Sequence, residues 1–321
     1  MSAHLSICIP TYNYGAFVAT AIQSVFADPH PGIEIVVLDG GSTDTTKDVV
    51  QKLAAGRPFV KYVHQSERGG IDSDLSRCVE LASGEYCWLL SADDALVPGA
   101  IQRILKEFER GYDVLLANRI WCDANLNPQS THAWLTGDCD DCAVDFSDAD
   151  QMVDYLDRAR SLGALFSFMS VIGFRRERWL RTQAVATLIG SNYAHVQRLF
   201  SMARTGTGLR YIAEPLVLCR GGHDSFREGG LASRLAIDLR GYWMLSQVIF
   251  PNDPAMQEAF RAVVTREHPW PRWVRARGDA RDTAQWKEVE RLLSAYGYNR
   301  AQLMALNALG ALSKHVLPSA A

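Results

Sequence analysis

The chain has 321 residues, of which 48% are hydrophobic, which is enough apolar material for one large domain or two smaller ones. Its formal net charge of −3 argues against a nucleic-acid partner, because such a partner requires a basic field. The sequence contains no run of about 18 apolar residues, so we expect no membrane-spanning helix. The N-terminus lacks the basic and apolar regions of a signal peptide, and we therefore expect a cytoplasmic protein.

Seven cysteines are scattered along the chain, and only Cys139 and Cys142 have the spacing of a metal-binding pair. A zinc site would need a second such pair or suitably spaced histidines, and the sequence has neither. We therefore expect free thiols in a reducing compartment.

In the first 120 residues, short apolar runs alternate with segments of helical spacing. Strands are predicted at 5–10, 33–40, 60–65, 85–91 and 113–121, and helices at 15–27, 43–56, 72–84 and 98–111. This alternation predicts a parallel sheet with helices on both faces. Ligands of such sheets bind at the carboxyl ends of the strands.

Beyond about residue 125 the pattern is less regular. Residues 125–165 are polar and rich in turn formers, which predicts a long connection. A buried strand is predicted at 166–174, helical structure at 176–203, and a strand pair that ends in a polar loop at 209–226. From residue 231 onward the spacing predicts helices only.

Two adjacent carboxylates, Asp93 and Asp94, follow the fourth predicted strand at the expected ligand edge. A bound cation would remove their repulsion, and their hard oxygen ligands suit Mg²⁺ or Mn²⁺. The alternative is a solvated turn ahead of the helix that begins near Pro98. Asp39 ends the second predicted strand at the same edge, and the two glycines after it allow a sharp turn or the close approach of a ligand. Asp44 is expected only to cap the helix that follows.

Five blocks of the sequence, in their order and spacing, resemble the family 2 glycosyltransferases: ICIPTYN, VVLDGGSTDTT, SERGGIDSDL, ASGEYCWLLSADD and VPGAIQRIL. The resemblance is close over residues 4–120 and loose over 165–228. It implies the GT-A fold, an α/β architecture with a doubly wound, mixed and mostly parallel sheet, helices on both faces and a C-terminal helical region. It further implies a nucleotide-sugar-binding half (1–125), an acceptor-binding half of the same domain (126–228) and the helical region (229–321).

The resemblance assigns donor-binding roles to residues at the sheet edge. In such enzymes the turn after strand one and the aspartate after strand two hold the base and ribose, and a basic residue after strand three lies near the nucleotide. The matching residues here are Pro10, Thr11, Tyr12, Asp39 and Arg68, with Asp72 beside Arg68. Asp94 would bind the metal, Mn²⁺ or Mg²⁺, and Asp93 the ribose or a water of the metal. The usual Asp-x-Asp pattern is not kept, because Ser91 stands where many members have the first aspartate.

A later loop of the family carries a histidine that reaches the diphosphate and the metal. The run CRGGHDSF at 219–226 resembles this loop, so His223 is a predicted metal ligand and Arg220 a predicted phosphate contact. Inverting members also carry an acidic pair that takes the proton from the acceptor hydroxyl. Ser191 and Asn192 stand in that place here, and His195 becomes the candidate catalytic base, because an unperturbed histidine has a pKa of about 6.5. The alternatives are a histidine that only binds the acceptor or packs, and a retaining enzyme that needs no such base.

The runs SNYAHV, GGIDSDL and SGEYCWLLSADD together resemble the abequosyltransferase-like proteins. This implies a CDP-sugar donor and a lipid-linked (undecaprenyl) oligosaccharide acceptor in bacterial O-antigen assembly. Two other functions stay open. A nucleotidyltransferase is disfavoured, because the turn PTYNYGAF lacks the basic residue that its phosphate loop would need. A nucleotide-sugar-binding module without catalysis is favoured by the missing acidic pair.

In the C-terminal region, Trp270 and Trp273 lie among several arginines. Tryptophan and arginine together suit a membrane interface with anionic headgroups, and equally a protein–protein contact. The sequence therefore predicts either a peripheral contact with the inner membrane or packing of the C-terminal helices, within the chain or in a homodimer.

Overall fold

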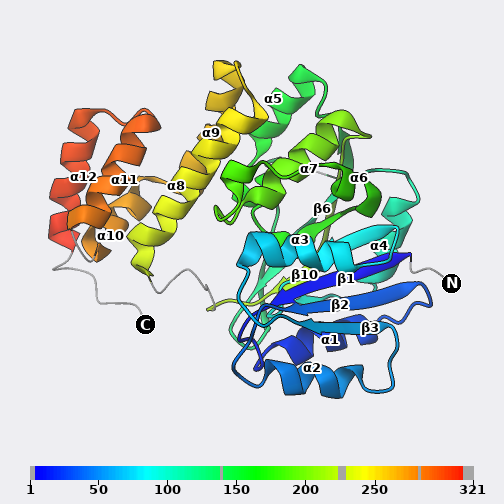
Figure 1. Ribbon diagram of the computed structural model, residues 1–321. Helices are drawn as coiled ribbons and strands as arrows, with labels where there is room; N and C mark the ends of the chain where they lie inside the picture. Colours follow the sequence, from blue (N-terminus) through cyan, green and yellow to red (C-terminus); the bar gives the residue numbers. More distant parts are fainter. Residues whose placement is uncertain (1–3, 138–139, 223–228, 281–282, 314–321) are drawn as a thin grey trace. The chain divides into compact units, whose positions relative to one another are not determined.

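The computed structural model describes residues 4–137, 140–222, 229–280 and 283–313. The chain divides into two units, Met1–Gly222 and His223–Ala321. The first unit is built around a β-sheet, and the second is made of helices (Figure 1). Every predicted site residue except His223 belongs to the first unit.

The sheet of the first unit has the strand order β3-β2-β1-β4-β9-β6-β10-β5, with β7 paired to β6 and β8 paired to β10. Its strands are β1 Leu5–Thr11, β2 Ile33–Asp39, β3 Val60–His64, β4 Tyr86–Leu89, β5 Ala95–Leu96, β6 Val114–Cys122, β7 Pro128–His132, β8 Cys142–Val144, β9 Ile172–Arg175 and β10 Leu209–Cys219. The long ladders β1–β2 and β6–β10 are parallel, while β9 runs antiparallel between β4 and β6. The predicted mixed, mostly parallel sheet is confirmed.

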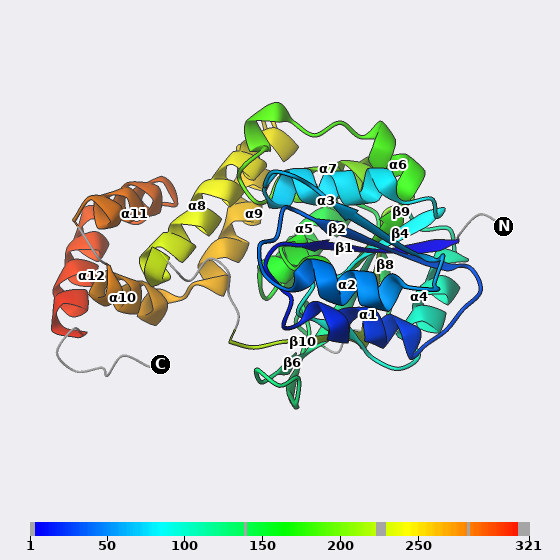
Figure 2. The ribbon, with the colours of Figure 1, turned by 60° about the horizontal axis from the view of Figure 1, so that its bottom comes forward.

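Helices cover both faces of this sheet, as predicted. The helices are α1 Val18–Phe26, α2 Thr46–Ala54, α3 Ile71–Leu81, α4 Ala100–Phe108, α5 Ala149–Arg158, α6 Arg176–Arg181 and α7 Ala194–Thr205. Figure 2 shows α3, α6 and α7 over one face and α1, α2 and α4 over the other. Because both faces are covered, β1 is buried along its whole length, which explains why its sequence is a continuous apolar run.

Three short 3₁₀ turns, Leu162–Leu165, Met169–Val171 and Ala186–Leu188, occur in the segments that join α5, β9, α6 and α7. The middle one leads directly into β9, where Gly173 lies against the buried Trp88 of β4. A Cβ atom on Gly173 would lie 2.6 Å from Cε3 of this indole, so only glycine fits there. The Trp88 Nε1 donates to the carbonyl of Ser170 at 2.8 Å, which fixes the turn against β4.

Three segments differ from the prediction. The expected long connection at 125–165 contains β7, β8 and α5, because a turn at Asp123 folds β7 back onto β6. The buried strand expected at 166–174 is a strand only from Ile172. The strand pair expected at 209–226 is the single strand β10 as far as Cys219, because Pro215 shifts the register against β6 without ending the strand.

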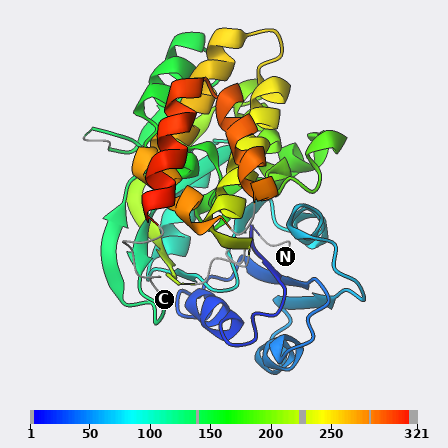
Figure 3. The same cartoon turned by 90° about the vertical axis from the view of Figure 1, so that its left-hand side faces the viewer.

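The described elements of the second unit are all helices, joined by short turns, as predicted (Figure 3). Its helices are α8 Gly230–Ile249, α9 Pro254–Glu267, α10 Trp270–Asp279, α11 Thr283–Ala295 and α12 Arg300–Ser313. Trp273 is fully buried in its core. A buried polar pair also lies there, with the His268 Nε2 2.8 Å from Oδ2 of Asp238. Among the described helices, none has the length and apolar character needed to cross a membrane.

Candidate active site at the carboxyl edge of the sheet

The parallel register of β1, β2 and β3 brings Thr11, Asp39 and His64 into one row at the carboxyl edge. Asp39 is fully buried. Its Oδ1 accepts a hydrogen bond from the backbone N–H of Ser42 at 2.7 Å, and its Oδ2 accepts one from the hydroxyl of Tyr62 at 2.6 Å. The His64 Nδ1 lies 3.2 Å from the same Oδ2. The strands thus hold one carboxylate rigidly at the edge where a ligand is expected.

Burial by itself would raise the pKa of Asp39, but the hydrogen bonds from Ser42, Tyr62 and His64 outweigh it and hold the pKa below its ordinary value. Asp39 is therefore an ionised acceptor at neutral pH. Beside it, Oγ1 of Thr11 is buried and has no hydrogen-bond partner in the described parts of the chain. Such an orphaned hydroxyl next to a charged acceptor is suited to a ligand that carries hydroxyl groups.

The two glycines after Asp39 allow a sharp turn and make room for a neighbouring carboxylate. Gly41 has a φ of +86°, which permits the sharp turn. A Cβ atom on Gly40 would lie 2.6 Å from Oδ2 of Asp74, so the missing side chain lets this carboxylate come close. Asp74 is buried, which raises its pKa, and its Oδ1 accepts a hydrogen bond from Nε2 of Gln65 at 2.7 Å.

The structure brings together two of the residues predicted to bind the donor. The guanidinium of Arg68 lies 4.2 Å from the ring centre of Tyr12, a cation–π contact between the loops that follow β1 and β3. The pKa of Asp74 responds to the charge of Arg68, which places Asp74 in the same neighbourhood. The prediction that Asp72 stands beside Arg68 as a donor contact is less direct, because Asp72 is engaged elsewhere.

Asp72 binds the start of α7. Its Oδ2 accepts hydrogen bonds from the N–H groups of Gly190 at 2.8 Å and Asn192 at 3.0 Å, and its Oδ1 accepts one from Ala194 at 3.1 Å. Two positions along a helix turn a side chain through about 200°. Asp72 and Asp74 of α3 therefore face different parts of the molecule. A direct role for Asp72 in donor binding stays a prediction.

Asp93 and Asp94 follow β4 at the same edge, and both are buried. The Oδ2 of Asp94 accepts a hydrogen bond from Oγ of Ser170 at 2.6 Å, and its Oδ1 accepts one from the N–H of Arg220 at 3.0 Å. The Oδ1 of Asp93 accepts one from Oγ of Ser91 at 2.6 Å. Burial, followed by the charge of Asp93, raises the pKa of Asp94 to about 7. A cation bound beside the pair would oppose this shift, because it favours the ionised form.

Within the described residues, no group of three or more His, Cys, Asp or Glu side chains could hold a metal ion by itself. Mg²⁺ and Mn²⁺ do not require one, since they bind through one or two carboxylates together with waters and substrate phosphates. Each oxygen of Asp94 accepts one of these hydrogen bonds, and a carboxylate oxygen has a second lone pair for a metal ion. The buried, adjacent carboxylates thus fit such an ion. The predicted ligand His223 lies outside the described residues.

Arg220, the residue after β10, supports the carboxylate pair. Besides its N–H bond to Asp94, its Nε donates to the carbonyl of Asp93 at 2.9 Å and a terminal nitrogen donates to the carbonyl of Ala124 at 2.6 Å. The guanidinium also lies 4.9 Å from the ring centre of Phe17. Much of its donor capacity is thereby used within the protein. The predicted contact of Arg220 with a phosphate stays a prediction.

His195 lies in the first turn of α7 and is buried, with its Nε2 2.9 Å from the carbonyl of Phe166. A carbonyl only accepts hydrogen bonds, so Nε2 carries the proton and Nδ1 keeps the lone pair. Nδ1 is buried and has no partner among the described residues. Burial lowers the pKa of His195, so the ring is neutral at pH 7. Ser191 and Asn192 precede α7, as the resemblance predicted.

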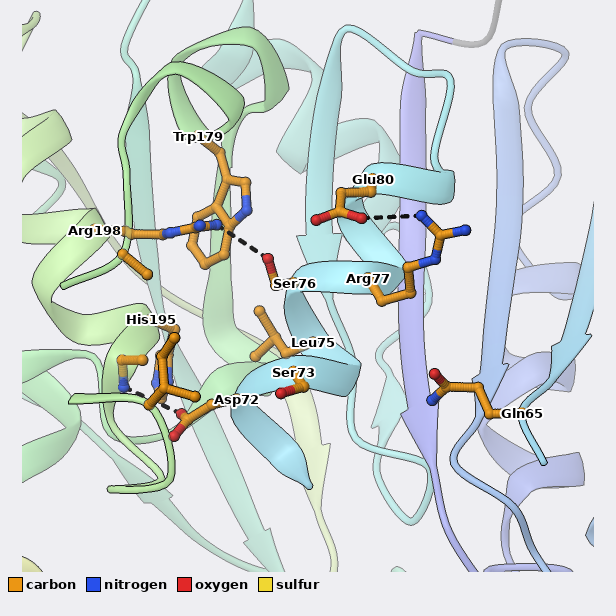
Figure 4. Close-up of a pocket in the computed structure, with 13 residues that line it drawn as sticks. Gln65, Asp72, Ser73, Leu75, Ser76, Arg77, Glu80, Trp179, His195 and Arg198 are labelled. Atoms are coloured by element: carbon orange, nitrogen blue, oxygen red, sulfur yellow. Dashed lines mark hydrogen bonds and ion pairs between the residues drawn. The ribbon is translucent and has the colours of Figure 1, made fainter. Parts of the chain in front are cut away.

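Asp72 and His195 line a cavity of about 340 Å³ between α3 and the segment that leads to α7 (Figure 4). A terminal nitrogen of Arg198 donates to Oγ of Ser76 across this cavity at 3.2 Å, and its guanidinium lies 4.8 Å from the ring centre of Trp179. The cavity offers room for a ligand next to the candidate base.

Comparison with known proteins decides the family. The profile of glycosyl transferase family 2 matches residues 6–138. The abequosyltransferase RfbV of Salmonella typhimurium is 32% identical over 272 residues, which cover 83% of this chain and 81% of that protein. The chain belongs to glycosyl transferase family 2. A β-1,3-glucosyltransferase of Campylobacter jejuni that acts on GalNAc(5)-diNAcBac-PP-undecaprenol is 31% identical over 144 residues, 44% of this chain and 47% of that one.

Solved structures confirm the GT-A fold that the resemblance implied. The crystal structure of residues 1–349 of S. aureus TarS has a TM-score of 0.62 at 14% identity and covers 99% of this chain and 93% of its own. The mannosyltransferase PcManGT of Pyrobaculum calidifontis, in complex with GDP-Man and Mn²⁺, has a TM-score of 0.53 at 16% identity and covers 98% of this chain and 88% of its own. As a member of family 2, the chain is a glycosyltransferase, and the nucleotidyltransferase and binding-module alternatives are set aside.

Proposed function

We propose that this family 2 glycosyltransferase transfers a sugar from a nucleoside-diphosphate donor to a saccharide of bacterial surface polysaccharide, of the O-antigen type. A CDP-sugar is the favoured donor, with an abequose-like dideoxyhexose as the sugar and an undecaprenyl-linked oligosaccharide as the acceptor. The 32% identity with an abequosyltransferase, which extends over 83% of the chain, supports this substrate class. The observation that carries the proposal is the buried Asp93–Asp94 pair at the edge that also holds Thr11 and Asp39.

The donor's nucleoside would bind along the row formed by β1 and β2. Asp39 is an ionised acceptor for base N–H or ribose hydroxyl groups, and the orphaned Oγ1 of Thr11 supplies a neighbouring partner. Pro10 precedes Thr11 on β1 and helps to shape the turn that follows this strand. Tyr12 and Arg68 are already in contact and form the flank of this site.

A divalent ion, Mn²⁺ or Mg²⁺, would be held by Asp94 and Asp93, with His223 as a further ligand. Bound there, it would supply positive charge to the departing nucleoside diphosphate. Ser170 and the N–H of Arg220 orient the two oxygens of Asp94, and Ser91 orients Asp93. These contacts fix the carboxylates before the donor arrives, so little reorganisation is needed during the reaction.

The acceptor would approach through the cavity that His195 lines. Its hydroxyl oxygen forms a bond to the anomeric carbon while the bond from that carbon to the diphosphate oxygen breaks. In the inverting mechanism, Nδ1 of His195 takes the hydroxyl proton, because it holds the free lone pair of a neutral ring. This step requires the side chains that cover Nδ1 to move aside when the acceptor binds.

The proposal is tested by thermal shift with CDP, UDP, GDP and dTDP in the presence of Mn²⁺. The nucleotide sugar with the same base as the most stabilising nucleotide is then assayed for hydrolysis. CDP should raise the melting temperature most, and its sugar donor should be turned over slowly without an acceptor. Asp94→Ala should lose both effects while keeping the circular dichroism spectrum of the folded chain. A wild-type protein that none of the four nucleotides stabilises would contradict the proposal.

For the peripheral contact, we propose α12 rather than the tryptophans of α10. Trp273 is fully buried, and Trp270 is partly buried and stacks on Tyr298, so both already pack within the chain. On α12, by contrast, Met304 and Leu312 are each more than 60% exposed. Replacing both by glutamine should abolish co-sedimentation with vesicles of anionic lipid, and retention of binding would exclude α12 as the contact.

A further inference from the structure

Arg119, on the second half of β6, is a cation that the predicted site does not use. β6 pairs with β10 so that Arg119 stands opposite Val217 and Trp121 opposite Cys219, one residue before Arg220. Because the N–H of Arg220 binds Asp94, this register puts Arg119 at the edge of the carboxylate pair. The charge of Arg119 lowers the pKa of Asp94, in agreement with that placement.

Arg119 makes no ion pair with a carboxylate in the part of the chain that the structure describes. A terminal nitrogen donates to Sγ of Cys219 at 3.4 Å, a weak acceptor. Its Nε is buried and has no hydrogen-bond partner among the described residues. Other partly buried arginines differ in this respect: Arg175 contacts Glu85 at 2.7 Å, and Arg210 contacts Glu107 at 2.6 Å.

Three aromatic rings hold the guanidinium of Arg119 in place. Its central carbon lies 4.3 Å from the ring centre of Phe168, 4.7 Å from that of Trp134 and 5.5 Å from that of Trp121. Trp134 is itself buried, and its Nε1 donates to the carbonyl of Ala117 at 2.7 Å. Cation–π contacts offset part of the cost of removing the charge from water, but they leave the N–H donors unused. The cation is thus fixed in position and ready for an anion.

We propose that Arg119 binds the phosphate of the donor that leaves with the nucleotide, that is, the distal phosphate of the nucleoside diphosphate. The inference rests on the proposed function, because it places the diphosphate next to Asp93 and Asp94. A diphosphate there brings more negative charge than one divalent ion removes, and an arginine fork forms strong charge-assisted bonds to phosphate oxygens. Arg119 would act beside Arg220, the phosphate contact that the resemblance predicted, whose side-chain nitrogens already bind the carbonyls of Asp93 and Ala124.

The test compares nucleoside diphosphate and monophosphate binding by calorimetry in Mn²⁺, with the base that stabilises the wild type most. Arg119→Met keeps an unbranched apolar side chain among the aromatic rings and removes the charge. We expect its diphosphate affinity to fall about 10- to 100-fold, the scale of a lost hydrogen bond to a charged group, and its monophosphate affinity to change less than about twofold. Arg57→Met is the matched control, because the guanidinium of Arg57 also lies over an aromatic ring, 4.9 Å from the ring centre of Phe26. Arg57 precedes β3 and so lies at the amino-terminal edge of the sheet, opposite the proposed site.

Equal losses for both nucleotides, or no loss for either, would overturn the assignment. If Arg119→Met fails to fold, Arg119→Lys decides in the same way, since it keeps the charge and loses the planar fork. For Arg119→Lys, a several-fold loss of affinity that is confined to the diphosphate supports the proposal, and unchanged affinity for both nucleotides overturns it. A wild-type chain that binds neither nucleotide with Mn²⁺ instead contradicts the proposed function itself, so the two failures are distinguishable.

Discussion

Ser170 donates a hydrogen bond of 2.6 Å to Oδ2 of Asp94, across 76 residues of sequence. The same hydroxyl accepts the N–H of Ser91 at 2.9 Å, and the carbonyl of Ser170 accepts from Nε1 of Trp88. The hydroxyl proton is therefore directed at the carboxylate, because the serine oxygen is already in use as an acceptor. One residue of the turn before β9 connects the end of β4 to the proposed metal ligand.

Replacing Ser170 by alanine should weaken Mn²⁺ binding by about 10-fold or more, the scale seen when a residue that orients a metal ligand is removed. The loss of its hydrogen bond should also raise the pKa of Asp94 further. Mn²⁺ titration in the presence of the nucleoside diphosphate measures the effect. Ser147→Ala is the control, since the hydroxyl of Ser147 donates to the exposed Asp145. Equal Mn²⁺ affinity in the two variants would show that Ser170 does not orient the ligand.

Asp94→Asn should stabilise the metal-free protein in mildly alkaline solution while removing transfer. The folded-state pKa of Asp94, about 7, lies above the value of about 3.9 in an unfolded chain. Between these values the folded chain binds more protons, so its free energy of unfolding falls as the pH rises through this window. The melting temperature of Asp94→Asn should therefore exceed that of the wild type at about pH 8 and match it at about pH 4.

Mn²⁺ provides the complementary measurement for the same group. The ion binds the ionised carboxylate, so it should raise the melting temperature of the wild type at about pH 8 and have little effect at about pH 5. It should leave Asp94→Asn almost unaffected at either pH. A variant that Mn²⁺ stabilises as strongly as the wild type would exclude Asp94 as the main ligand.

Tyr62→Phe should destabilise the protein by about 1–2 kcal/mol at neutral pH, because it removes a hydrogen bond to the buried carboxylate of Asp39. The sign of the pH dependence follows from the lowered pKa of Asp39. The stabilisation that ionised Asp39 gives the folded chain is present above the unfolded pKa of about 3.9 and is lost as the pH falls through the pKa of the folded state. The difference in free energy of unfolding between variant and wild type, from urea denaturation, should therefore shrink in acid. A difference that stays constant with pH would exclude this mechanism.

The sequence predicted the parallel half of the fold well, because buried parallel strands appear as continuous apolar runs with helical spacing between them. It also placed Asp39 and Asp93–Asp94 at the carboxyl ends of β2 and β4, where the structure has them, and their roles stay predictions. The prediction was wrong at 209–226, where a strand pair was expected: the structure has the single strand β10 as far as Cys219, which takes up Pro215 as a register shift against β6. Local patterns do not reveal where a strand continues through an irregularity.

The partners of the site residues were harder to find from sequence. Ser170 reaches Asp94 only because β9 is inserted antiparallel between β4 and β6, a pairing that no local pattern predicts. Arg119 lies within a run that was correctly predicted as a strand, but two of its three aromatic neighbours, Trp134 and Phe168, come from later segments of the chain. Tyr62 and His64 carried a weak signal, because two polar rings two positions apart share one side of a strand.

Asp72→Asn should affect α7 rather than the nucleotide. Asp72 now accepts hydrogen bonds from backbone N–H groups at the start of α7. The asparagine would turn an NH₂ group toward some of these donors, so the first turn of α7 would lose part of its capping. We expect a loss of about 0.5–2 kcal/mol in the free energy of unfolding, because exposed and part-buried N–H groups at the helix start lose their acceptor. The position of His195 should shift with the helix start, so the KM for the acceptor should rise while the affinity for the nucleoside diphosphate stays near that of the wild type.

Asp74→Asn is the matched variant two positions away on α3, next to Gly40 and Gln65. It should show the opposite pattern, with weaker nucleotide binding and an unchanged acceptor KM, and the same pattern in both variants would refute the separation of their roles.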